Sequence, residues 1–305
     1  MIVMSLPTFG EQEQYSRDET EQDFIFNYVW RDANDTQQSL SFNLNKIALK
    51  EQFHHTKAYK QDIAQRHIYV ALQKAAMKIP RKEARVKIQK VTNHIRISVD
   101  SKSPEKQQHW LNNLYTAQEA AFDAYLLENY YSRYTSPTGQ NAVKPDHPRF
   151  VKENREFLLP VAQAIYEKLD RDSSTRAYVN LLLSWLQSIP YNTLEDRITS
   201  NGSGYLPPAQ VITGNQGDCD SKTVLAASLM RSLLPKLSMV MIYLPDHALL
   251  GAALPKREHE SAVTINGIDY LLMEPTGPAL FSAGEIAPSS AQYIESGMFT
   301  SEKVP

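Results

Sequence analysis

The only cysteine in the chain, Cys219, lies where a polar turn meets a long apolar run. The run from Val224 to Leu234 is apolar on almost every side, which is typical of a helix that other elements surround. Asp218 or Asp220 is suited to cap the N-terminus of this helix. The positive end of the helix dipole stabilises a thiolate, whereas the two flanking carboxylates destabilise it. A reactive thiol therefore requires that these carboxylates point elsewhere.

A histidine and a carboxylate follow Cys219, each at the edge of an apolar, strand-like run. His247 precedes the run Ala248–Leu254, and Glu274 follows the run Ile268–Met273. An imidazole can take the proton of an attacking thiol and later protonate a leaving amine, and a carboxylate can fix its tautomer. A lone cysteine is more often just a small buried apolar side chain. The occurrence of cysteine, histidine and carboxylate in this order favours nucleophilic thiol chemistry over that structural role.

The pairing of these two strands decides whether Glu274 reaches His247. If the strands are antiparallel neighbours, the start of one lies beside the end of the other, with opposed Cβ atoms about 5 Å apart. Residues 255–267 then form an excursion that contains its own Asn266-Gly267 turn. If that turn only joins 263–265 to 268–270, the last strand is displaced outward and Glu274 does not reach.

An acyl-transfer site also needs hydrogen-bond donors for the developing oxyanion. The backbone N–H of Cys219, at a helix start, is one candidate. Gln187, near the end of an upstream helix, is a candidate side-chain donor, and Gln216 is closer in sequence. The alternative for Gln187 is an ordinary place on the polar face of an amphipathic helix.

Four local segments resemble the transglutaminase-like superfamily of papain-like thiol enzymes, in its bacterial type. They are GDCDSKTVLAASLMRSL, DHALLGA, YLLMEPTGP and, more weakly, WLQSIPY upstream. The resemblance covers roughly residues 150–288, about half the chain. It implies a central cysteine helix packed on an antiparallel sheet, with Cys219 as nucleophile, His247 as general base and Glu274 as the orienting acid. The third position is more often Asp in this superfamily, so the longer Glu274 must sit farther back.

By this resemblance we expect thiol-dependent acyl transfer on a peptide or protein substrate, through a thioester on Cys219. The acceptor is water in a cysteine peptidase or amidase and an amine in a transglutaminase, and the three residues do not distinguish the two. The chemistry needs no metal and no organic cofactor. The alternative is a non-catalytic peptide- or protein-binding module that retains the same fold.

The chain is predicted to be an α+β protein with an N-terminal ββαββα unit. Its first half contains two hairpins, 24–44 and 86–99, each followed by a helix. We place the N-terminal domain at 1–136. Residues 137–148, rich in Pro, Gly and Asn, form the predicted linker, and 149–305 form the transglutaminase-like domain.

The composition excludes several classes of function. A hydrophobic content of 42% and a charged content of 22% are those of a soluble globular protein. The net charge of −2 offers no basic field for nucleic acid and no polybasic membrane patch. No apolar run reaches the roughly 18 residues of a membrane span, and Met1–Leu6 is too short for a signal peptide. We expect a soluble protein and leave its compartment open, as the cytoplasm or, if a leader was trimmed, the periplasm; the substrate and the oligomeric state also stay open.

Overall fold

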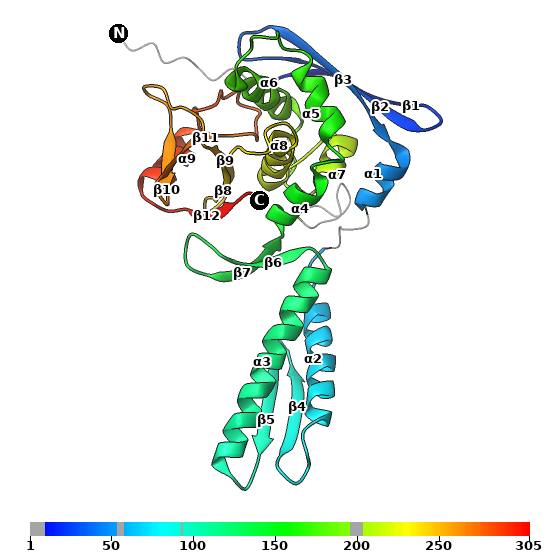
Figure 1. The fold of residues 1–305 in the computed structure, drawn as a ribbon, viewed down its shortest axis with the longest axis vertical. Helices are drawn as coiled ribbons and strands as arrows, with labels where there is room; N and C mark the ends of the chain where they lie inside the picture. The colour runs from blue at the N-terminus through cyan, green and yellow to red at the C-terminus, as the bar shows by residue number, and fades with distance from the viewer. Residues whose placement is uncertain (1–9, 54–57, 93, 196–203) are drawn as a thin grey trace. The chain divides into compact units, whose positions relative to one another are not determined.

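The structure is a computed structural model that describes residues 10–53, 58–92, 94–195 and 204–305 (Figure 1). It has a mixed α+β architecture with antiparallel sheets, which confirms the predicted class at that level. The chain forms two compact units. The first comprises Met1–Thr56, Tyr134–Ala142 and Asp146–Pro305, and the second comprises Lys57–Arg133 and Val143–Pro145.

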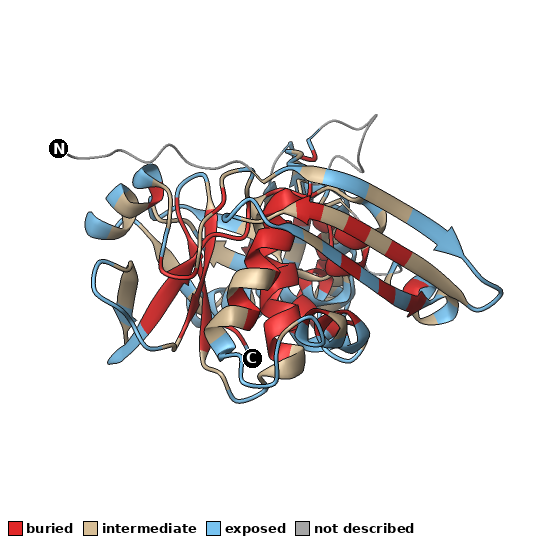
Figure 2. Ribbon diagram, turned by 90° about the horizontal axis from the view of Figure 1, so that it is seen from above, coloured by how far each residue is buried: buried red, intermediate tan, exposed pale blue. Residues whose placement is uncertain are grey.

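Three antiparallel strands open the first unit, in the order β1 (Gln12–Glu19), β2 (Asp23–Arg31) and β3 (Gln37–Asn45). Buried and less buried residues alternate along β2 and β3, as period-two strands with one covered face require (Figure 2). The predicted 24–44 hairpin is therefore confirmed. The sequence QEQYSRDE of β1 lacks that alternation, and β1 was not predicted. Asn45 then caps the short helix α1 (Lys46–Gln52).

The aromatic face of this sheet packs on helices that lie far away in the sequence. Trp30 Nε1 donates to Ser184 Oγ at 3.0 Å, and the Tyr28 hydroxyl donates to the Ile212 carbonyl at 3.1 Å. The Tyr28 ring also meets the Trp185 ring edge-on, with centroids 5.2 Å apart. The predicted N-terminal domain 1–136 is thus divided, because residues up to 56 belong to the same compact unit as residues 146–305.

The second unit is built from α2 (Gln61–Met77), β4 (Arg85–Val91), β5 (His94–Asp100) and α3 (Pro104–Glu128). The predicted hairpin and both predicted helices are present, and Ser103 caps α3 by accepting from Lys106 N. One face of the β4–β5 ribbon packs on the two helices. Its core includes Leu72, Ile88, Ile97 and Leu114.

Residues 137–148, the predicted linker, contain regular structure. They contain the turn between the paired strands β6 (Tyr131–Thr135) and β7 (Asn141–Pro145), with Gly139 at φ +82°. They also contain the start of α4 (His147–Asn154), which Asp146 caps. Gly and Pro here mark a hairpin turn and the first turn of a helix instead of a flexible connection.

Helix α8 (Cys219–Leu233) lies at the centre of the first unit, and its residues 221–231 are all buried (Figures 1 and 2). It contacts four other helices and strand β9, as the apolar sequence of its whole circumference predicts. Those four helices are α4, α5 (Leu159–Tyr166), α6 (Thr175–Ser188) and α7 (Pro208–Gly214).

A five-stranded antiparallel sheet with the order β10-β11-β9-β8-β12 completes the unit. The strands are β8 (Met239–Tyr243), β9 (Ala248–Ala252), β10 (Ala262–Ile265), β11 (Ile268–Met273) and β12 (Thr300–Lys303), with helix α9 (Pro288–Glu295) before the last. The Asn266-Gly267 turn joins β10 to β11, with both residues at positive φ. Strand β11 nevertheless lies directly beside β9, with Met273 opposite Leu250. Of the two pairings considered from the sequence, the one that brings Glu274 toward His247 is realised.

Trp30→Ala is expected to lower the free energy of unfolding by about 3–5 kcal/mol, because it removes a fully buried ring that covers α6. Urea denaturation followed by far-ultraviolet circular dichroism measures this loss. Ile47→Ala is the matched control, since the Ile47 side chain on α1 is 72% exposed, and its effect should stay within about 0.5 kcal/mol. Equal effects of the two changes would show that the β1–β3 sheet is not part of this core.

Candidate functional site

Cys219 is the first residue of α8, and its side chain is half-buried. Asp218 caps the helix by accepting a hydrogen bond from Ser221 N at 3.0 Å, so its carboxylate is turned toward the helix start. Asp220 instead lies beside the sulfur, with the thiol facing its Oδ1 at 3.8 Å. Of the two carboxylates that were required to point elsewhere, only Asp218 does so.

The surroundings of the sulfur favour the protonated thiol. Burial raises the pKa of the Cys219 thiol well above its ordinary value, and the charges of Asp220 and Asp218 raise it further. The nearby backbone N–H of Ala248 lowers this pKa in part. Burial, followed by the charge of Asp220, also raises the pKa of Asp218 to about 7, so Asp218 carries its proton for part of the time near neutral pH. The resting state of the site is therefore a thiol, and a reaction at the sulfur needs a base.

His247 and Glu274 form a hydrogen-bonded pair at one end of the sheet. His247 Nε2 lies 3.0 Å from Glu274 Oε1. His247 directly precedes β9, and Glu274 directly follows β11. The other carboxylate oxygen, Oε2, accepts from the Ala287 backbone N–H at 2.8 Å. Glu274 is thus held at two points, and its longer side chain reaches the ring. Because Glu274 occupies Nε2, the ring nitrogen left for a reacting group is Nδ1.

The sulfur and the imidazole belong to the same edge of the structure. The backbone amide that lowers the pKa of the Cys219 thiol belongs to Ala248, the residue that follows His247 in the chain. Thr223 Oγ1, one turn along α8, donates to the Ala248 carbonyl at 3.3 Å and so holds the same residue from the helix side. The pairing of β9 with β11 therefore brings His247 to Glu274, and the contact of α8 with β9 places the start of α8 near the residue that follows His247.

The prediction of Gln187 as an oxyanion donor is not supported, because its amide group is engaged in another direction. Gln187 Nε2 donates to the backbone carbonyls of Glu274 at 2.8 Å and Phe281 at 2.9 Å, and Oε1 accepts from Phe281 N. The side chain is 1% exposed. Gln187 thus positions the segment that carries Glu274, which is neither the role proposed for it nor an ordinary place on a polar face.

Lys222 ties the same segments to α8. Its side chain is fully buried, and Nζ donates to the backbone carbonyls of Ile189 and Thr276. Burial lowers the pKa of Lys222 to about 7. The Ile189 carbonyl lies two residues before Tyr191 in the sequence, and the Thr276 carbonyl lies two residues after Glu274. Lys222 thus connects both segments to the first turn of α8.

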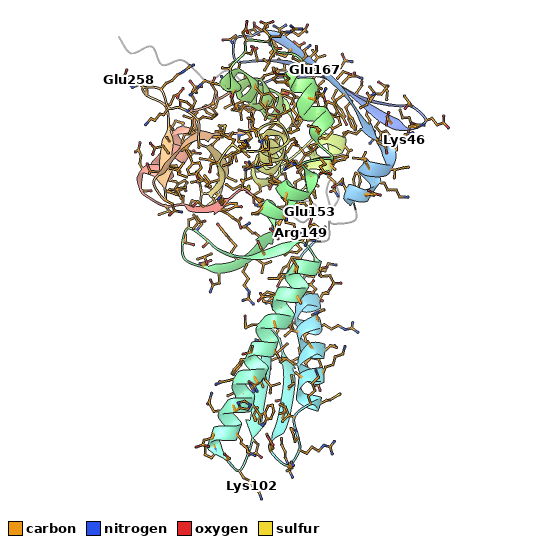
Figure 3. The ribbon with its side chains drawn as sticks, in the orientation of Figure 1. Lys46, Lys102, Arg149, Glu153, Glu167 and Glu258 are labelled. Carbon is orange, nitrogen blue, oxygen red and sulfur yellow. The ribbon has the colours of Figure 1, made fainter. Side chains whose placement is uncertain are left out.

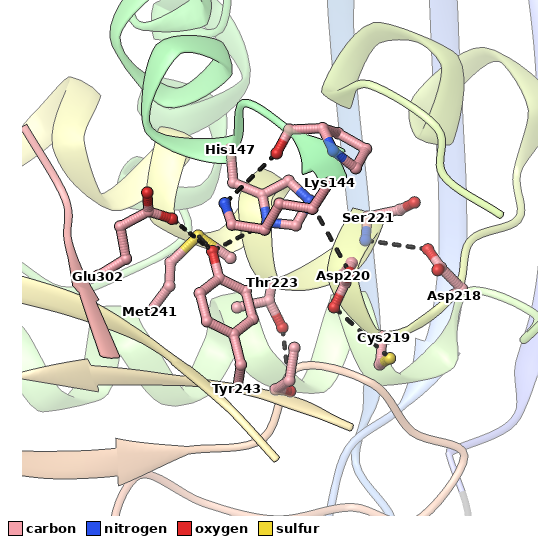
Figure 4. A network of polar contacts seen from close by, with 12 residues as sticks. Lys144, His147, Asp218, Cys219, Asp220, Ser221, Thr223, Met241, Tyr243 and Glu302 are labelled. Atoms are coloured by element: carbon pink, nitrogen blue, oxygen red, sulfur yellow. Dashed lines mark hydrogen bonds and ion pairs between the residues drawn. The ribbon is translucent and has the colours of Figure 1, made fainter. Parts of the chain in front are cut away.

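Sequence reasoning missed a second imidazole behind the thiol (Figure 4). His147 at the start of α4 is fully buried, with Nδ1 3.0 Å from the Tyr243 hydroxyl, which in turn donates to Glu302 Oε2 at 2.9 Å. His147 Nε2 lies 3.8 Å from Asp220 Oδ2. Asp220 therefore lies between the Cys219 sulfur and the His147 ring. His147 was overlooked because it lies within the segment predicted to be a linker. The one sequence feature that indicated regular structure there is Asp146, a residue type suited to cap a helix.

Two further features border the site. Tyr191 is half exposed and forms a bridge with Gly217, and burial together with the charge of Cys219 raises the pKa of its phenol. A pocket of about 240 Å³ opens on the other side of the imidazole and is lined by Leu244, Asp246, His247, Glu274, Ser289, Ser290 and Tyr293. Cys219 is not part of its lining, so this space adjoins the histidine and α9.

No protein-family model, curated protein or solved structure matches this chain. Within the described ranges, no three His, Cys, Asp or Glu residues are grouped so that they could hold a metal ion. No helix in the described part of the chain has the length and apolar character needed to cross a bilayer. The site is therefore interpreted from its own geometry and chemistry.

Asp220→Asn should lower the pKa of the Cys219 thiol, because it removes the largest nearby negative charge. The rate of carboxamidomethylation by iodoacetamide, followed against pH by intact mass, is expected to move about 1–3 pH units toward lower pH. Asp246→Asn is the control, because Asp246 is exposed and does not act on the sulfur. If the two variants have the same profile, Asp220 does not set the ionisation of the thiol.

Proposed function

We propose that this chain is a thiol enzyme that transfers acyl groups from peptide or amide substrates through a thioester on Cys219. The observation that carries the proposal is the 3.0 Å bond between His247 and Glu274, with the backbone amide of the neighbouring Ala248 close enough to lower the pKa of the Cys219 thiol. A nucleophile beside a base that a third group orients is the arrangement that such catalysis requires.

In the first half of the reaction, His247 Nδ1 takes the thiol proton while the sulfur attacks the carbonyl carbon. Glu274 holds the ring by Nε2 and stabilises the imidazolium that forms. The C–N bond then breaks, the imidazolium gives its proton to the leaving amine, and the acyl group stays on sulfur as a thioester. Water or a second amine, deprotonated by the same imidazole, releases the acyl group in the second half.

The backbone N–H of Cys219 is the proposed donor to the oxyanion, in place of Gln187. Amides in the first turn of a helix have no acceptor within the helix, and they point toward the positive end of its dipole. As the first residue of α8, Cys219 places such an N–H next to its own sulfur. An amide so placed suits the negative charge that develops on the substrate oxygen.

Because the pKa of the Cys219 thiol is raised, the proposed reaction depends on His247 as a general base. A cysteine that rests as a thiolate can react without a base, whereas Cys219 is protonated until its proton is taken. We therefore propose general-base activation during attack, in place of a permanent thiolate–imidazolium pair.

The proposed fold relationship is to the transglutaminase-like superfamily of papain-like enzymes. Two features support it: the local sequences around Cys219, His247 and Glu274, and a central cysteine helix that contacts strand β9 of an antiparallel sheet. Nothing in the geometry selects water or an amine as acceptor, so hydrolysis and transamidation are both included. The proposed partner is a peptide or protein substrate.

A non-catalytic peptide- or protein-binding module is the second candidate, and one observation favours it. Asp220, 3.8 Å from the sulfur, and the burial of the site together keep the proton on Cys219. A binding module that retains the fold needs no thiolate and is compatible with this environment.

Alkylation kinetics distinguish the two functions. Near neutral pH, His247→Ala should slow the labelling of Cys219 by iodoacetamide by about 10² or more, because it removes the only proposed base. Glu274→Gln should slow it less, since the ring remains but loses its orienting charge. His109→Ala, an exposed histidine on α3, is the control and should leave the rate unchanged.

The same proteins can be tested for chemistry with an activated acyl ester, followed by intact mass. The enzyme predicts an acyl adduct on Cys219 that decays in the wild type and fails to form in His247→Ala. Labelling of the wild type no faster than a free thiol, unaffected by His247→Ala, together with no adduct, would support the binding module and refute the enzyme.

A further inference from the structure

The net charge of −2 is the sum of two strongly opposed parts. The second unit, residues 57–133 and 143–145, contains 15 Lys and Arg residues against seven Asp and Glu residues, an excess of eight positive charges. The first unit contains the other 17 Lys and Arg against 27 Asp and Glu, an excess of ten negative charges. A strong local field of positive sign therefore exists in a chain whose total charge is near zero.

The β4–β5 ribbon of the second unit presents one face away from its core. Ile88, Ile97 and Val99 are buried on the inner face. Eight positions face the opposite way. Seven of them are exposed and polar, and three of these are Lys or Arg: Arg85, Lys87 and Gln89 on β4, and His94, Arg96, Ser98 and Asp100 on β5. Gln89 lies directly opposite Arg96 in the ladder. This face has one carboxylate, and its one apolar side chain is the partly buried Val91 at the closed end of the ribbon.

The cations of this face are not used to hold the second unit together. Among the contacts of the described residues, no ion pair and no side-chain hydrogen bond involves Arg85, Lys87 or Arg96. The ion pairs of the unit lie elsewhere, from Lys106 to Glu83 and from Arg133 to Glu119 and Asp123. The basic side chains on the ribbon are thus available to a partner, and folding does not account for them.

More cations surround the open end of the ribbon, where α2 ends and α3 begins. Lys78 follows α2, Arg81 and Lys82 lie in the turn before β4, and Lys102 lies in the turn before α3; all four are exposed. Figure 3 shows Lys102 at this end of the unit, pointing away from it. A groove of about 600 Å³ at the same end is lined in part by Arg81 and Arg85.

We infer that the second unit binds duplex DNA, with the β4–β5 ribbon in the major groove and the cations at its open end on the phosphates. The major groove admits a two-stranded β-ribbon, and guanidinium and amide groups are those that form paired hydrogen bonds with guanine and adenine edges. Arg96 and its cross-strand neighbour Gln89 supply one of each. The inference does not depend on the thiol site. It replaces the expectation, drawn from the net charge of −2, that the chain offers no basic field for nucleic acid.

An anionic membrane surface is the other polyanion that such a charge excess could meet. Peripheral membrane binding combines cations with exposed Trp, Phe or Leu side chains that enter the bilayer. The outward face of the ribbon carries none of these, and its regular alternation of hydrogen-bonding side chains suits base edges better. Duplex DNA is therefore the occupant that the observations favour.

The test uses the full-length chain and a fluorescent duplex of about 30 base pairs, with binding followed by anisotropy from about 50 to 200 mM salt. The wild type should bind with an affinity that falls steeply with salt. The variant Arg85→Thr/Lys87→Thr/Arg96→Thr, which keeps residues suited to a strand, should bind at least about tenfold more weakly and with a shallower salt dependence. Its far-ultraviolet circular dichroism and melting temperature should match the wild type.

The matched control removes three exposed lysines of the first unit, as Lys152→Ala/Lys236→Ala/Lys256→Ala, and should bind like the wild type. Absence of DNA binding at about 50 mM salt, or equal weakening by both triple variants, would overturn the inference. Equally tight binding of single-stranded DNA or duplex RNA would overturn the major-groove arrangement. Binding only to vesicles that contain phosphatidylserine would assign the surface to a membrane instead.

Discussion

The antiparallel pairing of β9 with β11 is the constraint on which the proposed chemistry depends. It sets Met273 opposite Leu250, so the segment just before β9 lies close to the segment just after β11, and His247 bonds to Glu274. A one-residue slip would turn Glu274 to the other face of the sheet. Buried polar groups resist that slip: Gln187 holds the Glu274 carbonyl, and Lys222 holds the Thr276 carbonyl. The donors and the carbonyls that accept from them are buried, so removing a donor leaves its carbonyl without a hydrogen bond.

The electrostatics of the site oppose its proposed nucleophile. Burial, Asp220 and Asp218 all favour the thiol over the thiolate, while the Ala248 N–H and the start of α8 favour the thiolate. The groups that favour the thiol have the larger effect, so Cys219 is protonated at rest. The proposed reaction therefore needs the imidazole to remove that proton, which a preformed thiolate would not need. Asp220 also connects the sulfur to His147, and through it to Tyr243 and Glu302, so the charge beside the thiol belongs to a buried network.

Local patterns predicted the features that local physics determines. The apolar circumference of α8, the alternation in β2 and β3 and the Asn-Gly turn before β11 each predicted the element that is found. Features set by distant contacts were not predictable. The β1–β3 sheet belongs with α6 because Trp30 and Tyr28 find partners more than 150 residues away. The roles of Gln187 and His147 depend on backbone carbonyls and hydroxyls that no periodicity marks, and the total charge concealed how Lys and Arg are segregated.

The central claim, that a thiol and an oriented imidazole share one reaction site, is open to a direct chemical test. Dichloroacetone is a short reagent with two alkylating carbons, and it bridges a thiol and an imidazole only when both reach the same small volume. Peptide mapping of the treated protein by mass spectrometry is predicted to find Cys219 bridged to His247, with the bridge absent in His247→Ala. A Cys219 adduct with no bridge, or with a bridge to any other residue, would contradict the account.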